Sequence, residues 1–173
     1  FCPMEPKLFL ERVTDQPDLS LVLFTGSSNV LDNIYYNIGK NISYYNNYPR
    51  IVGESGGKNY HFIGPFHNNV DDQIREAAIK TVESSFNYSG QKCSACSIVY
   101  VPEEYLESFK KKLIGAIKTY NKLKDNYGVI NKKSFIKLKA FLNHFREDEN
   151  IDFVYDGDIT MDKNSYYVDP HVL

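Results

Sequence analysis

The first third of the chain combines short apolar runs with apolar residues at helical spacing. Residues 19–25, LSLVLFT, end in a Gly-Ser-Ser turn, which is typical of a buried parallel strand that leads into a helix. Val30, Ile34 and Ile38 then recur at the spacing of one helical face. After an Asn- and Tyr-rich loop, residues 50–63 read RIVGESGGKNYHFI, an apolar strand broken by glycines. Two strands joined through a helix predict a parallel βαβ unit.

From residue 70 onward the pattern is mainly helical. We expect helices over residues 70–86, from Pro102 onward, and over residues 131–145, with Asn69 as the N-cap of the first. Strands are expected at residues 97–101, 151–158 and 166–173. The apolar residues expected on the buried faces are Val70, Ile74, Ala78, Val82 and Phe86 in the first helix, Leu106, Phe109, Leu113 and Ile117 in the second, and Phe135, Leu138, Leu142 and Phe145 in the third.

Length and composition favour a soluble globular protein. The 173 residues, 42% hydrophobic and 24% charged, suffice for one domain with a core or for parts of two. A net charge of −2 gives no reason to expect a nucleic acid or a membrane surface as partner. No apolar run approaches the roughly 20 residues of a membrane span. The chain starts without methionine and ends within a strand-like run, so we expect a piece of a longer protein.

The three cysteines are an odd set and too few for a disulfide framework, which favours a reducing compartment. Cys93 and Cys96 form a Cys-x-x-Cys pair without a second ligand pair nearby, so we expect no zinc site. A redox dithiol usually stands at a helix start, whereas this pair follows a helix and enters a strand. Cys96 fits a small buried residue. Cys93 follows a polar Ser-Gly-Gln-Lys turn and is better placed to be a nucleophile.

A nucleophilic thiol needs a partner that handles protons, and Glu54 is the carboxylate in the most unusual context. It ends an apolar strand immediately before Ser55 and two glycines, where a charge is costly unless it has a function. From this stretch alone, a catalytic base and an exposed carboxylate at a strand end are equally good interpretations.

Three motifs in series carry a family resemblance. FTGSS, ESGGKN and FNYSGQKCSA resemble, in order and separation, the FTGS, E-x-GGK and Gly-Gln-x-Cys hallmarks of the aldehyde dehydrogenase superfamily. QPDLSLVLFTGS, YPRIVGESGGKNYHFI, FNYSGQKCSACSIVYVP and YYVDPHVL are most similar to its delta-1-pyrroline-5-carboxylate dehydrogenase branch. The likeness runs from about Val13 to the end. The sequence departs from many relatives after FTGS, where residues 29–31 replace a Val-Gly pair.

The resemblance implies a role for each motif. Cys93 is then the nucleophile that forms a thiohemiacetal and later a thioester, and Glu54 is the general base that activates water. Gly26 and Ser27 correspond to the turn that meets the pyrophosphate of NAD, and the main chain of Ser55 to a contact near the nicotinamide. The backbone N–H of Cys93 is expected to donate to the substrate oxyanion. The family's other oxyanion donor, an Asn, lies in an N-terminal half that has no counterpart here.

The implied fold is α/β and aldehyde dehydrogenase-like. Residues 1–57 would end a Rossmann-like NAD-binding domain, and residues 58–173 would form most of the catalytic domain, incomplete at its C-terminus. The implied activity is NAD-dependent oxidation of L-glutamate gamma-semialdehyde to glutamate by a homo-oligomer. The implied location is the mitochondrial matrix in a eukaryote or otherwise the cytoplasm. An aldehyde dehydrogenase of other substrate range and a non-catalytic paralogue remain alternatives.

Overall fold

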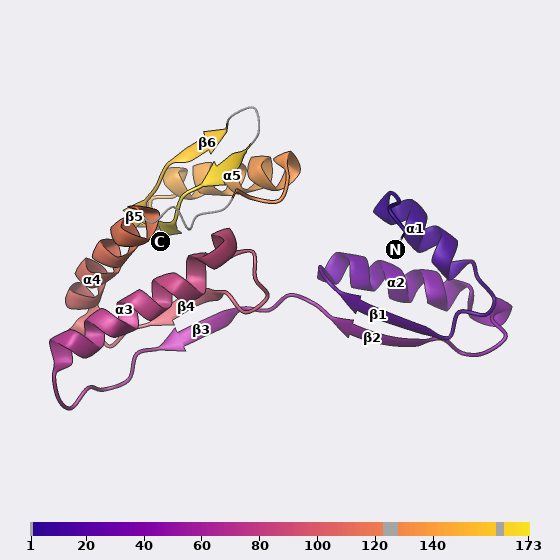
Figure 1. The fold of residues 1–173 in the computed structure, drawn as a ribbon, viewed down its shortest axis with the longest axis horizontal. Helices are drawn as coiled ribbons and strands as arrows, with labels where there is room; N and C mark the ends of the chain where they lie inside the picture. Colours follow the sequence, from indigo (N-terminus) through magenta and orange to yellow (C-terminus); the bar gives the residue numbers. More distant parts are fainter. Residues whose placement is uncertain (1, 123–127, 162–164) are drawn as a thin grey trace. The chain divides into compact units, whose positions relative to one another are not determined.

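Two pairs of parallel strands organise the chain (Figure 1). The computed structural model describes residues 2–122, 128–161 and 165–173. The chain divides into two compact units, Phe1–Gly57 and Lys58–Leu173. The first unit contains α1 (Pro6–Thr14), β1 (Leu21–Thr25), α2 (Ser28–Lys40), the short 3-10 helix η1 (Ile42–Tyr44) and β2 (Arg50–Glu54). The second contains β3 (Asn59–Phe62), α3 (Val70–Phe86), η2 (Asn87–Gly90), β4 (Cys96–Tyr100), α4 (Glu103–Lys122), α5 (Lys132–Glu147), β5 (Tyr155–Asp156), β6 (Ile159–Met161), β7 (Tyr166–Val168) and β8 (His171–Val172).

The first unit is the expected βαβ arrangement, and the structure confirms it. β1 and β2 pair in parallel, with Leu21 opposite Arg50 and Thr25 opposite Glu54. Helix α2 connects them and packs Ile34 and Ile38 against the strands. The helix lies so close to β2 that a Cβ at Gly53 would sit 2.5 Å from a methyl carbon of Leu31. Only glycine allows this approach without displacing Leu31.

Two features of the N-terminal third differ from the sequence prediction. Residues 50–63 form two strands in two different sheets, β2 paired with β1 and β3 paired with β4. Residues 55–58, which contain two glycines, end the first strand before the second begins. Helix α1 corresponds to no element expected from the sequence. Pro6 occupies the first turn, where a proline needs no N–H partner, and the Glu5 carboxylate accepts from Leu8 N–H at 2.9 Å.

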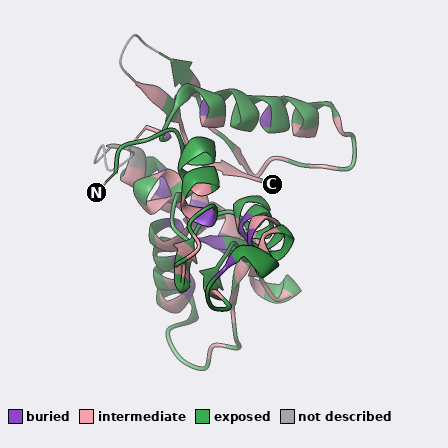
Figure 2. Cartoon of the chain, turned by 90° about the vertical axis from the view of Figure 1, so that its right-hand side faces the viewer, coloured by how far each residue is buried: buried purple, intermediate pink, exposed green. Residues whose placement is uncertain are grey.

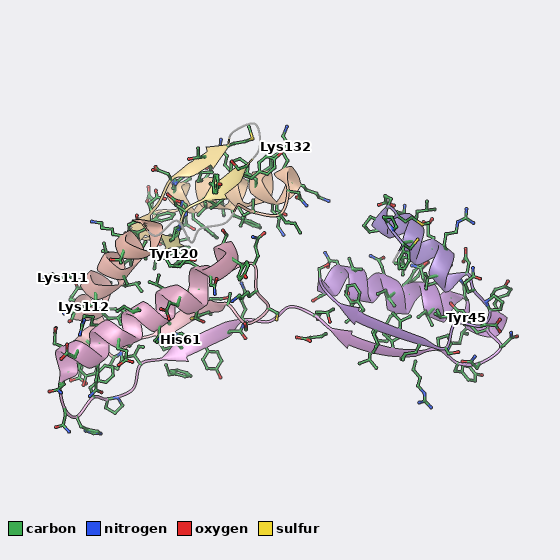
Figure 3. The ribbon with its side chains drawn as sticks, viewed as in Figure 1. Tyr45, His61, Lys111, Lys112, Tyr120 and Lys132 are labelled. Carbon is green, nitrogen blue, oxygen red and sulfur yellow. The ribbon has the colours of Figure 1, made fainter. Side chains whose placement is uncertain are left out.

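Helices α3 and α4 form the main core of the second unit with β3 and β4. The buried cluster is Ile74, Ala78, Val82, Phe109, Leu113 and Ile117, as expected. Val70, expected on the same buried face, is instead 37% exposed. His61 of β3 lies 3.0 Å from the hydroxyl of the buried Thr81, and the Tyr120 hydroxyl donates to the carbonyl of Phe86 (Figure 3). Asn69 is the N-cap residue of α3, as expected, but it does not cap the helix with its side chain. Its backbone is left-handed, with φ 49°, and its side chain makes no capping hydrogen bond.

The C-terminal strands are shorter than predicted. Residues 151–158 contain only the two-residue strand β5, and residues 166–173 are divided between β7 and β8. β6 lies outside both expected strands, and the four strands form two antiparallel pairs, β5 with β8 and β6 with β7. Arg146 of α5 donates two hydrogen bonds to the Asp156 carboxylate, from Nε to Oδ2 at 3.0 Å and from Nη2 to Oδ1 at 2.6 Å. This pair lowers the pKa of Asp156 and ties the helix to β5. Phe135 and Leu142 are buried as expected, but Leu138 is 38% exposed.

Several large apolar residues of the strands are exposed in both units. Figure 2 colours each residue of the chain by its burial. On β3 and β4, the rings of Tyr60, Phe62 and Tyr100 pack against one another and are all exposed. Leu23 of β1 is 72% exposed. Among the described residues, no helix has the length and apolar composition needed to cross a bilayer.

The α3–α4 core predicts a graded response at Ile117, whose side chain is fully buried. In the full-length protein, Ile117→Val should lower the free energy of unfolding by about 0.5–1.5 kcal/mol and Ile117→Ala by about 2–5 kcal/mol, because the second change leaves a larger cavity. Urea denaturation followed by tyrosine fluorescence measures both. Equal and small effects of the two substitutions would contradict the packing.

Candidate functional site

Four of the five residues selected from the sequence lie at one edge of the first unit. Gly26 and Ser27 directly follow β1, while Glu54 ends β2 and Ser55 follows it. The N–H of Gly26 donates to the carbonyl of Glu54 at 3.0 Å and continues the parallel pairing. The carboxyl ends of parallel strands are where open α/β sheets bind their ligands. The two short motifs are therefore brought together by pairing of the strands that precede them.

The turn after β1 also begins a helix. Ser27 is the N-cap of α2 with an extended backbone, φ −74° and ψ 145°, and its hydroxyl makes no capping hydrogen bond. The first intrahelical bonds run from Val30 and Leu31 to the carbonyl of Ser27. The N–H groups of Ser28 and Asn29 precede these bonds and have no acceptor within the helix. An uncapped helix start of this kind is suited to bind an anion.

Cys93 lies in the second unit, in a tight turn between η2 and β4. Three consecutive left-handed residues, Tyr88, Ser89 and Gly90, reverse the chain after α3, with φ of 54°, 57° and 70°. Residues 92–95 then form a turn closed by a hydrogen bond of 3.1 Å from Ala95 N–H to the carbonyl of Lys92. Cys93 is the second residue of this turn, and its side chain is exposed.

The side chain of Asn59 holds this turn from β3. Its Nδ2 donates to the carbonyl of Cys93 at 2.7 Å and to the carbonyl of Ala95 at 3.1 Å. Asn59 is the first residue of β3 and stands opposite Cys96 in the parallel pairing. The register shifts between Asn59 and Tyr60, so the strands are irregular where they meet the turn.

Gln91 holds the other end of the loop. Its Nε2 donates to the carbonyl of Tyr88 at 2.9 Å and to that of Gly128 at 3.3 Å, while its Oε1 accepts from Ile130 N–H at 2.8 Å. The amide thus bridges the left-handed run and the segment that leads into α5. Lys92 extends over the ring of Tyr88, with Nζ 5.0 Å from the centroid, which places a positive charge beside the turn.

The two neighbouring cysteines occupy different environments. Cys96 is 7% exposed, and its thiol donates to the carbonyl of Ile98 at 3.3 Å, which confirms the expectation of a small buried residue. Cys2, Cys93 and Cys96 are all free thiols. Among the described residues, no group of His, Cys, Asp and Glu side chains is arranged to hold a metal ion.

Sequence reasoning missed Asn59 and Gln91. Both stand inside the quoted motifs, ESGGKN and SGQKC, but neither was given a role. A signal was available, since each is an amide side chain beside a glycine-containing turn, where backbone carbonyls need donors. The catalytic and cofactor-binding roles of Cys93, Glu54, Gly26, Ser27 and Ser55 remain predictions.

Comparisons with known proteins agree with the motifs. The sequence model of the Aldehyde dehydrogenase family matches residues 2–173. The chain is 33% identical to the zebrafish (Danio rerio) protein named mitochondrial delta-1-pyrroline-5-carboxylate dehydrogenase and 37% identical to the Emericella nidulans protein of the same name. These alignments cover 100% and 99% of the chain but 31% and 30% of the relatives. The chain therefore spans about a third of their length.

Solved structures show the same fold. The delta-pyrroline-5-carboxylate dehydrogenase of Mycobacterium tuberculosis, solved with NAD bound, has a TM-score of 0.78 at 24% identity, covering 92% of this chain and 30% of that one. A Bradyrhizobium japonicum proline utilization A mutant, D779W, has a TM-score of 0.80 at 20% identity, covering 96% and 16%. The expected α/β fold of aldehyde dehydrogenase type is confirmed. With the family's sequence model matched from residue 2 to residue 173, the chain belongs to the aldehyde dehydrogenase family.

Proposed function

We propose that the protein containing this chain oxidises L-glutamate gamma-semialdehyde to L-glutamate with NAD as hydride acceptor. The observation that carries the proposal is the contrast between the two cysteines, because Cys93 is exposed on a tight turn while Cys96 is buried. The substrate class is supported by the names of the zebrafish and Emericella nidulans relatives. NAD is supported by its presence in the Mycobacterium tuberculosis structure.

The residues at the carboxyl edge of β1 and β2 fit a dinucleotide. The N–H groups at the start of α2 suit a pyrophosphate, and the Ser27 hydroxyl is not occupied by helix capping. We assign Gly26 and Ser27 to the pyrophosphate and the main chain of Ser55 to the nicotinamide end. When bound, NAD accepts the hydride that the aldehyde carbon loses. In this assignment the first unit is the end of the NAD-binding domain and the second unit is the thiol-bearing catalytic domain.

Cys93 carries the covalent chemistry in this proposal. Its thiolate attacks the aldehyde carbon, a carbon–sulfur bond forms, and the carbonyl oxygen gains negative charge. The backbone N–H of Cys93 donates to that oxygen and stabilises the charge where it develops. Loss of hydride from the same carbon leaves a thioester on Cys93, which holds the acyl group until water attacks.

Glu54 acts in the second half of the reaction. It is an exposed carboxylate at the end of β2 and is able to accept a proton from water. The hydroxide equivalent attacks the thioester carbon, the carbon–sulfur bond breaks, and glutamate leaves while Cys93 returns to its thiolate. We place the protein in the mitochondrial matrix of a eukaryote, as the names of its relatives suggest, or otherwise in the cytoplasm, and expect a homo-oligomer.

Replacement of Cys93 by Ser tests the nucleophile. In the full-length enzyme, Cys93→Ser should lower kcat by more than about 100-fold, because the hydroxyl is a far weaker nucleophile than the thiolate. NAD affinity should stay close to that of the wild type, since the dinucleotide is held by other residues. NADH absorbance and a fluorescence titration with NAD measure the two quantities. Cys96→Ala is the matched control and should remain active; a Cys93→Ser enzyme with near-normal turnover would refute the assignment.

Replacement of Glu54 by Gln tests the base. The change keeps the shape of the side chain but removes a proton acceptor, so hydrolysis of the thioester should slow by about 100 to 10,000-fold. Rapid mixing with NAD and the semialdehyde should then show a burst of NADH near one per active site, followed by slow turnover. A missing burst would place Glu54 at thiol deprotonation instead, which is also catalytic. Unchanged steady-state turnover would leave Glu54 as an ordinary strand-end residue.

A further inference from the structure

The peptide groups on both sides of Cys93 are held in fixed orientations. The carbonyl of Lys92 belongs to the same peptide plane as the N–H of Cys93, and the Ala95 N–H binds that carbonyl at 3.1 Å. The carbonyl of Cys93 belongs to the next plane, and Asn59 Nδ2 binds it at 2.7 Å. With both planes held, the two backbone dihedrals of Cys93 have little freedom. The first restraint lies within the turn, whereas the second comes from another strand.

We propose that Asn59 is a positioning residue for Cys93, which fixes the direction of the thiol and of the backbone N–H by holding the carbonyls of Cys93 and Ala95 together. The inference rests on the proposed function, in which that thiol is the nucleophile and that N–H binds the oxyanion. Asn59 acts through Cys93 in this scheme and touches no reacting atom. Its contribution is pre-organisation, since a misplacement of about 1 Å can cost about 100-fold in rate.

The residue type suits this task. A primary amide nitrogen carries two hydrogens, and Asn59 directs it at two carbonyl oxygens at 2.7 and 3.1 Å. An aspartate in the same place would present oxygens to those carbonyls and would repel them. An alanine would leave the Cys93 carbonyl without this donor. Asn59 can reach both carbonyls because it opens β3 opposite Cys96, where the parallel register is interrupted.

The test uses Asn59→Ala and the near-isosteric Asn59→Asp in the full-length enzyme. Both should lower kcat by about 10 to 100-fold, with the KM for NAD close to the wild-type value. The thiol itself should survive in Asn59→Ala. Iodoacetamide is a small reagent that is not held in one orientation by the protein, so it should alkylate Cys93 at nearly the wild-type rate. Peptide mass spectrometry identifies the alkylated cysteine. Loss of turnover with a retained thiol is a signature that general destabilisation does not produce.

Two controls keep the result specific. Cys96 is buried, so its alkylation reports local unfolding of the turn and β4. Gln73→Ala removes another amide donor, to the carbonyl of Asn68 at the start of α3, and should change neither kcat nor alkylation. Normal kcat in Asn59→Ala, or Cys96 alkylated as fast as Cys93, would overturn the positioning role. Full activity of Cys93→Ser would overturn the proposed function as well, so the two failures are distinguishable.

Discussion

Parallel pairing is the constraint on which the rest of the structure depends. Two parallel strands cannot be joined by a tight turn, so each pair requires a helical crossover, α2 in the first unit and α3 in the second. The crossover brings together residues that are far apart in sequence. Gly26 meets Glu54 at the carboxyl ends of β1 and β2, and Asn59 meets the Cys93 turn at the amino ends of β3 and β4. Residues 55–58 connect the carboxyl end of β2 to the amino end of β3.

The loop that carries Cys93 depends on hydrogen bonds more than on apolar packing. Most of its residues are exposed, and Ala95 and Cys96 are its first buried members. Two side-chain amides and one turn hydrogen bond supply the order that burial does not. In the proposed function this arrangement reconciles two demands, because a nucleophilic thiol has to be open to substrate while the main chain around it has to be rigid.

The sequence predicts the long helices and the parallel units well, because each long helix buries a single face and its apolar residues recur at the spacing of that face. Ile74, Ala78 and Val82 are buried as expected. The errors lie where a local pattern competes with a specific context. Residues 50–63 look like one apolar strand, but they serve two sheets. Leu138 keeps the helical period of α5 but is exposed, so periodicity alone does not say how far a buried face extends.

The site shows the same division. The sequence selects Cys93 and Glu54 as candidates because their residue types are unusual for their surroundings, and the Gly26-Ser27 turn because of the family resemblance. The hydrogen bonds of Asn59 and Gln91 depend on where carbonyls point, which no residue pattern specifies. Their partners lie 34 and 39 positions away along the chain for the bonds to Cys93 and Ile130.

The left-handed run after α3 also limits how this loop can change over evolutionary time. The left-handed backbone at Tyr88 and Ser89 has a conformational free-energy cost. Glycine would avoid this cost and asparagine or aspartate would reduce it, whereas a β-branched residue would increase it. Gly90 is restricted further, because a Cβ there would lie 3.0 Å from the carbonyl oxygen of Ser85. At positions 88 and 89, substitution by small polar residues such as asparagine or aspartate is therefore tolerated, whereas substitution by valine, isoleucine or threonine is disfavoured. This holds even though neither position carries a reacting group of the proposed mechanism.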